Sequence, residues 1–343
     1  MKFFIFFKRN LISFSFVLFV FLLVAFSNST FYATKNGLTL WANSVVPSLF
    51  PFLVAVELLN HTSVVYYLSV LLDKYMKPLF NLPGISAYPF IMGLLSGYPI
   101  GAKIVCDLYD NDFCTKEEAE RMLSFTNNSG PLFIIGTVGI SFYSNSTIGI
   151  ILLITHVLAS ITVGIVTGIF SKSGNTIYRN KNLGNIHNSA DISVSNLGEI
   201  LGLAIINSIK NILVIGGFVT LFSVITTLLE KTHCISIVSN TISSISKLDS
   251  SIVSSFISGI VEFTNGLSKL SSIHIKNISL IFVLSAFIIG FGGISVSLQV
   301  LSIISKHNLS IKKYLLGKLM QATLAGLYTF LILLIPIFNF DIW

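Results

Sequence analysis

The chain has 343 residues, of which 53% are hydrophobic and only 10% are charged. Soluble proteins carry about 25% charged residues, so this composition excludes an ordinary water-facing exterior and predicts an all-α, polytopic membrane protein. The apolar runs are too long and uniform for a transmembrane β-barrel, whose strands alternate over about 10 residues. The net charge of +7 is expected to reflect basic cytoplasmic loops, because no Lys/Arg-rich run with interleaved aromatics indicates a nucleic-acid partner.

The sequence carries no signature of a catalytic site. Metalloprotease, phosphate-loop and nucleophile-elbow patterns are absent. The three cysteines form neither an even framework nor a C-x-x-C pair. We therefore expect a protein that is not an enzyme and that uses no cofactor or metal.

The N-terminus combines a basic flank with an apolar run. Lys2, Lys8 and Arg9 precede the run 11–27, which at about 1.5 Å per residue spans roughly 25 Å. The same pattern describes a signal peptide, but no A-x-A-like cleavage site follows. We therefore favour an uncleaved anchor helix within 1–37, with its N-terminus in the cytoplasm.

The remaining apolar runs fall into two halves. The first half, 38–170, holds the runs 38–59, 63–72, 86–99, 130–140 and 147–170. The polar stretch 171–199 is predicted to be a long loop or hinge. The second half, 200–343, holds the runs 200–229, 235–272, 277–304 and 314–337, of which the Ser/Ile-rich part 235–258 is predicted to be amphipathic or re-entrant.

Glycine, proline and asparagine interrupt two runs of the first half. Bilayer hydrocarbon cannot satisfy free backbone groups, so broken helices are buried in protein or line a cavity. Half-helix N-termini at such breaks direct positive dipole ends toward anions. We therefore predict an anion pocket, and the alternative is a pair of surface turns with the lysine reaching toward headgroups. Its residues are Gly97, Tyr98, Pro99 and Lys103 at the first break and Asn127, Asn128, Ser129 and Pro131 at the second.

The second half offers further candidate substrate-binding residues. They are Glu262, Thr264, Asn265 and Gly266, followed by Gly292, Gly293, Ser295 and Gln299. An acid among apolar neighbours is costly in lipid and suggests a function, so Glu262 is a candidate for binding a coupling proton or cation; the alternative is a surface glutamate at a helix end. Glu57 is a second candidate acid. We read His156 as hydrogen-bonded packing, with a proton relay as the alternative.

Weak similarity between the halves predicts an internal repeat. Segments 41–56, 92–105 and 113–124 resemble 205–220, 288–301 and 308–319, and Gly97 falls on Gly292. Segment 103–121 is acidic, whereas 305–318 carries four lysines, including Lys318, and no acid. Opposite charge on equivalent loops predicts opposite sides of the membrane and hence inverted halves; chance divergence is the alternative.

Four segments carry a resemblance to a known family. They are SVVPSLFPF (44–52), LPGISAYPFIMGLLSGYPIGAK (82–103), TKEEAERMLSFTNNSGPLFIIGTVG (115–139) and HVLAS (156–160). Together they resemble the sporulation integral membrane protein YlbJ (SpoVV) family, whose members carry the nucleoside-recognition or Gate domain. The resemblance covers about 38–170 with specific motifs and 200–337 more loosely.

The resemblance implies a transporter that moves dipicolinic acid toward the developing spore, in the mother-cell-derived outer forespore membrane. Lys103 and the donors of TNNSGP would face the carboxylates of this dianion, and Tyr98 or Phe125 would stack on its ring. The alternatives are a nucleoside transporter and a spore envelope assembly factor that transports nothing. The expected partners are the small organic anion, the lipid bilayer and a coupling ion; whether the chain forms a homo-oligomer is open.

Overall fold

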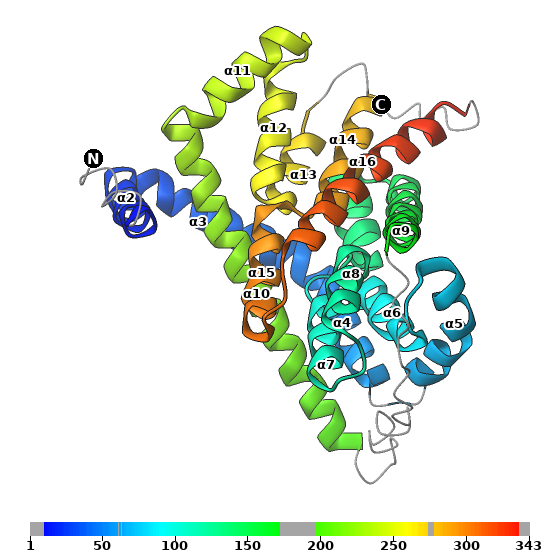
Figure 1. Ribbon diagram of the computed structural model, residues 1–343. Coiled ribbons are helices and arrows are strands. Elements are labelled where there is room, and N and C mark those ends of the chain that lie inside the picture. Colours follow the sequence, from blue (N-terminus) through cyan, green and yellow to red (C-terminus); the bar gives the residue numbers. More distant parts are fainter. Residues whose placement is uncertain (1–9, 61, 63, 172–196, 274–277, 336–343) are drawn as a thin grey trace, which may run out of the picture.

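The computed structural model describes residues 10–60, 62, 64–171, 197–273 and 278–335. Within these residues every regular element is helical, which confirms the predicted all-α class (Figure 1). The basic residues Lys2, Lys8 and Arg9 lie outside the described residues, as does nearly all of the predicted loop 171–199.

The elements of the first part run from the N-terminus to the end of the predicted first half. They are α2 (Leu11–Ala25), α3 (Ser27–Leu40), η1 (Trp41–Val45), α4 (Val46–Asn60), α5 (Val64–Phe80), η2 (Gly84–Ser86), α6 (Ala87–Ser96), α7 (Ile100–Asp110), α8 (Lys116–Thr126), η3 (Phe133–Phe142) and α9 (Ser146–Ile169).

The elements of the second part begin after the predicted loop. They are α10 (Leu197–Lys231), α11 (Cys234–Ser246), α12 (Ser250–Val261), α13 (Phe263–Ser271), α14 (Ile278–Phe291), α15 (Gly293–Ile304), η5 (Ser305–His307) and α16 (Lys312–Leu333).

Length and composition identify the membrane-spanning helices. Among the described residues, four helices are long and apolar enough to cross a membrane, and up to six spans result if each of two bent pairs counts as one. The bends are 96° between α2 and α3 and 89° between the end of α5 and α6. The chain is therefore an integral membrane protein with several helical spans, as its composition predicts.

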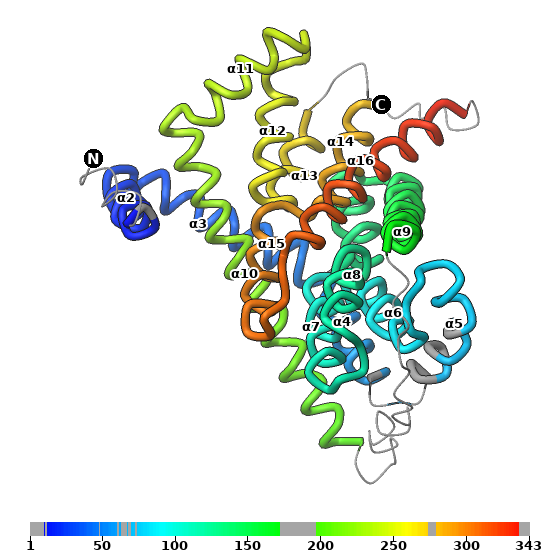
Figure 2. Tube along the Cα trace, viewed as in Figure 1, coloured from blue at the N-terminus to red at the C-terminus, as the bar shows by residue number. Residues whose placement is uncertain are grey.

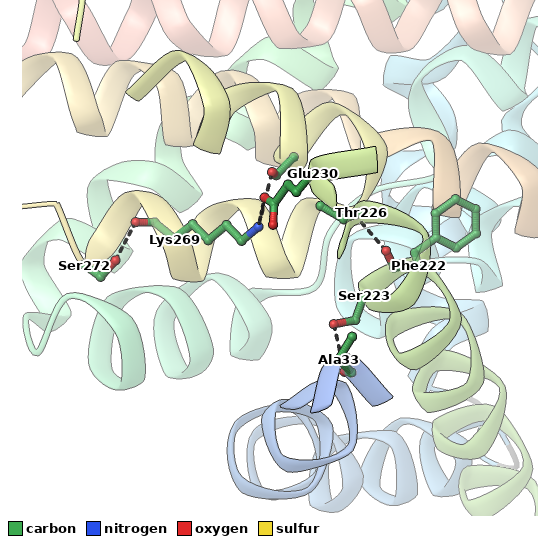
Figure 3. A network of polar contacts seen from close by, with 8 residues as sticks. Ala33, Phe222, Ser223, Thr226, Glu230, Lys269 and Ser272 are labelled. Carbon is green, nitrogen blue, oxygen red and sulfur yellow. Dashed lines mark hydrogen bonds and ion pairs between the residues drawn. The ribbon is translucent and has the colours of Figure 1, made fainter. Parts of the chain in front are cut away.

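The helix that contains the run 38–59 begins earlier than predicted. The polar sequence SNSTFYATKNG is helical as part of α3, because its small residues pack on α10. A Cβ on Gly37 would lie 2.9 Å from the Cα of Thr220, and Ser223 Oγ donates to the carbonyl of Ala33 at 3.2 Å (Figure 3). Figure 2 shows α3 crossing α10, with α2 at the left edge of the view, where its Phe19, Leu22 and Leu23 pack against a cluster of Ala33, Val224 and Leu228.

Two helical hairpins reverse the chain inside the molecule. Helices α6 and α7 turn back at Gly97–Pro99, and α12 and α13 turn back at Glu262. Glycines permit the close approach: a Cβ on Gly266 would lie 2.1 Å from the Cα of Gly259. In Figure 1, α12 and α13 occupy the upper part and α7 the lower end. The hairpin of the second half is thus α12–α13, which starts later than 235–258; that 235–258 is amphipathic or re-entrant stays a prediction.

Each half also contains two consecutive helices separated by a short break, a feature that we call a broken span. Helix α8 ends at Thr126 and the chain is helical again from Pro131 into η3, while α14 and α15 are separated by Gly292 alone, with φ +78°. Both halves therefore present two helices, a hairpin, a broken span and a long helix in the same order. In this order the first hairpin, with Gly97 at its tip, corresponds to the second hairpin, with Glu262 at its tip. The alignment of Gly97 with Gly292 instead matches a hairpin with a broken span. The inverted relation of the halves stays a prediction.

The two oppositely charged loops lie against each other, and the prediction that they occupy opposite sides is wrong. His307 Nδ1 and Asp110 Oδ2 are 2.7 Å apart, and Ser310 N donates to Glu120 Oε1 at 2.9 Å. Glu120 also faces Lys313 Nζ at 3.8 Å. Asp110 and Glu120 therefore face His307 and Lys313 at one end of the molecule, which accounts for opposite charge on the two loops without inversion.

Candidate functional site

A cavity lies where the two hairpin tips and the two broken spans meet. The empty space between its lining atoms is about 480 Å³, including space open to the outside, and about 40 Å³ of it can hold the centre of a water molecule. The lining is apolar with neutral polar groups interspersed. It consists of Val45, Leu49, Leu53, Ser96, Gly97, Tyr98, Ser129, Gly130, Phe133, Ile215, Phe263, Thr264, Val296 and Gln299.

The beginnings of four half-helices reach this cavity. Tyr98 precedes α7, Gly130 precedes the helical turn that opens η3, Phe263 begins α13, and Val296 lies in the first turn of α15. Each helix N-terminus carries unpaired N–H groups and a partial positive charge. Three of them, at α7, η3 and α15, carry no side-chain cap and favour a ligand with negative charge or strong hydrogen-bond acceptors, whereas the start of α13 is capped by Glu262.

Two of the opposing helix C-termini are covered by donors. Lys318 Nζ donates to the carbonyl of Asn127 at the end of α8 at 3.1 Å. Tyr98 Oη donates to the carbonyl of Ile289 in the last turn of α14 at 3.2 Å. The negative ends of these half-helices are therefore partly neutralised, while the positive ends stay directed at the cavity.

Aromatic rings join the two hairpin tips. Tyr98 and Phe263 meet edge to face with their ring centroids 6.0 Å apart, and Phe133 lies 4.9 Å from Phe263. Gly292 leaves room for this contact, because a Cβ there would lie 3.1 Å from Tyr98 Oη. All three rings line the cavity, so they offer apolar faces to a flat ligand.

A buried hydrogen-bond network holds the break between α8 and η3. The backbone N–H of Ser129 donates to His156 Nε2 at 3.2 Å, so this nitrogen is the unprotonated one. Asn128 Nδ2 donates to the carbonyl of Phe125 at 2.8 Å and to Ser160 Oγ at 3.2 Å. Side chains from α9 thus satisfy backbone groups that the break frees, as irregular backbone in a bilayer requires.

Several buried polar atoms at the site lack a partner among the described residues. Ser96 Oγ and Gln299 Oε1 both line the cavity and make no hydrogen bond. Ser295 Oγ and Asn265 Nδ2, close in sequence to the lining, are likewise unpaired. Because an unsatisfied buried polar atom costs about 1–3 kcal/mol, these atoms indicate a polar occupant of the cavity.

Glu262 is buried at the tip of the second hairpin and is not a surface residue. Only 1% of its surface is exposed. Its carboxylate accepts from the backbone N–H groups of Thr264 at 3.1 Å and Asn265 at 2.7 Å. It therefore caps the N-terminus of α13, which is one of the four half-helix N-termini at the cavity.

The structure brings many, but not all, of the predicted residues together. Gly97, Tyr98, Ser129, Thr264 and Gln299 line the cavity. The remaining predicted residues apart from Lys103 adjoin it on the same four breaks: Pro99, Asn127, Asn128, Pro131, Glu262, Asn265, Gly266, Gly292, Gly293 and Ser295.

Lys103 lies elsewhere, because its side chain is exposed on α7 and does not line the cavity. Phe125 stacks on Phe80 with centroids 5.1 Å apart, inside the core rather than at the cavity. Glu57 accepts from Asn207 Nδ2 at 2.7 Å, which joins α4 to α10. Lys103 therefore contributes no positive charge to the cavity lining, and of the two aromatic residues predicted for the pocket only Tyr98 lines it.

Sequence reasoning missed the buried cation of the site. Lys318 was counted with the basic loop 305–318, yet it lies in α16, and none of its surface is exposed. Its neighbour one turn on, Gln321, is also completely buried. A lysine and a glutamine three positions apart within an apolar helix lie on one face, and this spacing was the available signal.

The described residues contain no group of three or more His, Cys, Asp or Glu side chains that could hold a metal ion. The groups around the cavity are backbone N–H groups, hydroxyls, one amide and three aromatic rings, all of which can contact a ligand.

Comparison with known proteins gives two matches. The family model described as "Gate: Nucleoside recognition" matches residues 42–176, which include the first hairpin and the first broken span. The chain is also 32% identical over 322 residues to the "Sporulation integral membrane protein YlbJ" of Bacillus subtilis (strain 168). That alignment covers 90% of this chain and 79% of the relative.

Proposed function

The chain belongs to the family of the sporulation integral membrane protein YlbJ, and from this premise we propose that it is a membrane transporter for a small organic anion. The single observation that carries the proposal is the convergence on one cavity of three half-helix N-termini that have no side-chain cap, those of α7, η3 and α15. In transporters, such discontinuous helices hold the substrate near the middle of the bilayer and direct positive dipole ends at anionic groups.

The proposed substrate is dipicolinate, a flat aromatic dianion. Tyr98, Phe133 and Phe263 offer ring faces and edges for its ring. The free N–H groups at the helix starts offer donors for its carboxylates. The Lys318 ammonium lies 5.0 Å from the centroid of Tyr98, so it adds positive charge directly behind the cavity wall.

Transport requires parts that move relative to each other. The hairpin α12–α13 is tied to α10 at its outer end, where Lys269 Nζ lies 2.5 Å from Glu230 Oε1 (Figure 3). That pair is more than one-third exposed on both sides and is therefore weak. A weak ion pair at the outer end and an aromatic contact at the tip are compatible with movement of the hairpin α12–α13 relative to α10. Glu262 is the proposed site of the coupling ion, because it is the buried carboxylate at that tip.

The proposed membrane is the mother-cell-derived one around the forespore, with transport toward the spore. The test measures dipicolinate separately in mother cells and spores of a strain lacking this gene. We expect dipicolinate to accumulate in the mother cell while spores contain little, and re-expression of the chain to reverse this. Normal spore dipicolinate in the deletion strain would refute the proposed function.

A nucleoside transporter is the second candidate, and one observation favours it. No charged side chain lines the cavity among the described residues, and neutral hydrogen-bonding groups suit a nucleoside. A competition experiment separates the two candidates. For a dipicolinate transporter, excess uridine should leave dipicolinate binding to the purified protein unchanged. A nucleoside site would bind uridine more tightly than dipicolinate. An envelope assembly factor, the third alternative, would bind neither ligand.

A further inference from the structure

The end of α8 presents a negative helix terminus inside the molecule. The helix ends at Thr126, and its last carbonyl groups lack the N–H partners that a continuing helix would supply. Asn127, the first residue of the break, is completely buried. Its carbonyl oxygen accepts a hydrogen bond from Lys318 Nζ of α16 at 3.1 Å. The ammonium thus shares this terminus with neutral donors, because the carbonyl of Phe125 accepts from Asn128 Nδ2 at 2.8 Å and from Ser160 Oγ at 2.7 Å.

Lys318 is an unusual cation for this location. None of its surface is exposed. Its ammonium also donates to Gln321 Oε1 at 2.7 Å and lies over the ring of Tyr98. None of the ion pairs found in the described part of the chain includes it. A buried charge within a bilayer is costly and is retained for a function.

The ammonium also sets the direction of the surrounding network. Because an ammonium can only donate, Gln321 must turn its oxygen toward Lys318 and its nitrogen away. Gln321 Nε2 then donates to Asn128 Oδ1 at 2.8 Å. Asn128 in turn directs its own nitrogen at the carbonyl of Phe125. The positive charge of Lys318 therefore orients the side chains that hold the break next to Ser129.

We propose that the Lys318 ammonium is a resident cation of the broken span, held by α16 at the position where a dissolved cation would otherwise cover the end of α8. Half-helix C-termini and unwound carbonyls are where transporters coordinate coupling cations. Here the cation is covalently attached, so the break keeps its geometry without a metal ion at this point. Lys318 is thus a positioning residue for the cavity wall formed by Ser129 and Gly130.

The first experiment uses chemical rescue of the purified full-length protein, with no substrate present. Lys318→Ala removes a propylammonium-sized group and leaves a space for it. We expect a lower Tm for Lys318→Ala than for the wild-type protein, and recovery of at least half of the loss with n-propylammonium but not with n-propanol. Lys318→Met fills the same space without charge, so we expect it to be destabilised and not rescued. Lys103→Ala is the control for an exposed lysine and should respond to neither compound.

The role of the charge fails if Lys318→Met has the wild-type Tm, or if propylammonium raises the Tm of Lys318→Ala and Lys103→Ala equally. If Lys318→Ala does not accumulate, the Tm values of Lys318→Arg and Lys318→Met are compared instead, because arginine keeps the charge and methionine does not. Equal Tm values for these two would overturn the proposal. Since no step uses a substrate, the result is independent of whether the protein transports dipicolinate.

Discussion

Tyr98 and Phe263, at the tips of two hairpins from different halves of the chain, meet edge to face with their ring centroids 6.0 Å apart. The same tyrosine reaches a third element through its hydroxyl, which donates to the carbonyl of Ile289, and a fourth through Lys318. The two tips therefore form one wall of the cavity together, and we expect a ligand in the cavity to contact both.

Tyr98 variants test this wall. Tyr98→Phe keeps the ring and loses only the hydrogen bond to Ile289, which is worth about 1 kcal/mol, so we expect at most a roughly fivefold loss of dipicolinate affinity. Tyr98→Ala also removes the contacts with Phe263 and Lys318, and we expect a loss of at least about tenfold. Equilibrium binding of dipicolinate to the purified protein measures both. Equal affinity of the alanine variant and the wild type would show that the ring does not face the ligand.

Glycine variants test the hairpin packing. A Cβ on Gly93 would lie 1.7 Å from the carbonyl oxygen of Thr126, whereas a Cβ on Gly217 of α10 would meet nothing within 4 Å. Gly93→Ala should therefore lower the Tm sharply or prevent accumulation of folded protein. Gly217→Ala should leave the Tm unchanged or raise it slightly, because alanine favours a helix by about 1 kcal/mol over glycine. Thermal unfolding in detergent checks both, and similar behaviour of the two variants would contradict the described packing.

Cysteine labelling tests the placement of the charged loops. Asn111 and Asn308 are both exposed, on the two loops that the His307–Asp110 contact joins. In a Cys234→Ser background, single cysteines at these positions should react with a membrane-impermeant maleimide from the same side of sealed vesicles. Labelling from opposite sides would restore the interpretation that the sequence alone suggested.

Glu262 variants test the cap at the second hairpin tip. Its carboxylate accepts from two backbone N–H groups, and loss of such a cap costs about 0.5–2 kcal/mol. We expect Glu262→Ala to lower the Tm and to abolish transport, and Glu262→Asp, with its shorter side chain, to be intermediate in Tm. The control is Glu199→Ala at an exposed position of α10, which should change neither. Full transport by Glu262→Ala would exclude a role for this carboxylate in coupling.

The sequence predicts the breaks well because their causes are local. Glycine and proline near Gly97 weaken a helix through their own backbone preferences, and the asparagines before Ser129 favour helix ends and turns. The apolar runs likewise predict where most helices lie. The polar start of α3 was missed because its helix is stabilised by packing of Gly37 on α10, a long-range contact that no local pattern contains.

The sequence could not show which charges are buried. Lys103 follows a break directly, yet the α7 helix turns its side chain outward. Lys318 follows a lysine-rich loop, yet the packing of α16 against the break turns it inward. The alignment of the two halves from the sequence is also out of register. A glycine at a hairpin tip and a glycine at a broken span look the same in a sequence.

The most direct test of transport through this cavity is dipicolinate flux into liposomes that contain the purified protein. We predict saturable uptake by the wild-type protein, at least about tenfold slower uptake by Tyr98→Ala and Lys318→Met, and wild-type uptake by Lys103→Ala. Uptake that is absent from wild-type liposomes, or equal in all four proteins, would contradict the account.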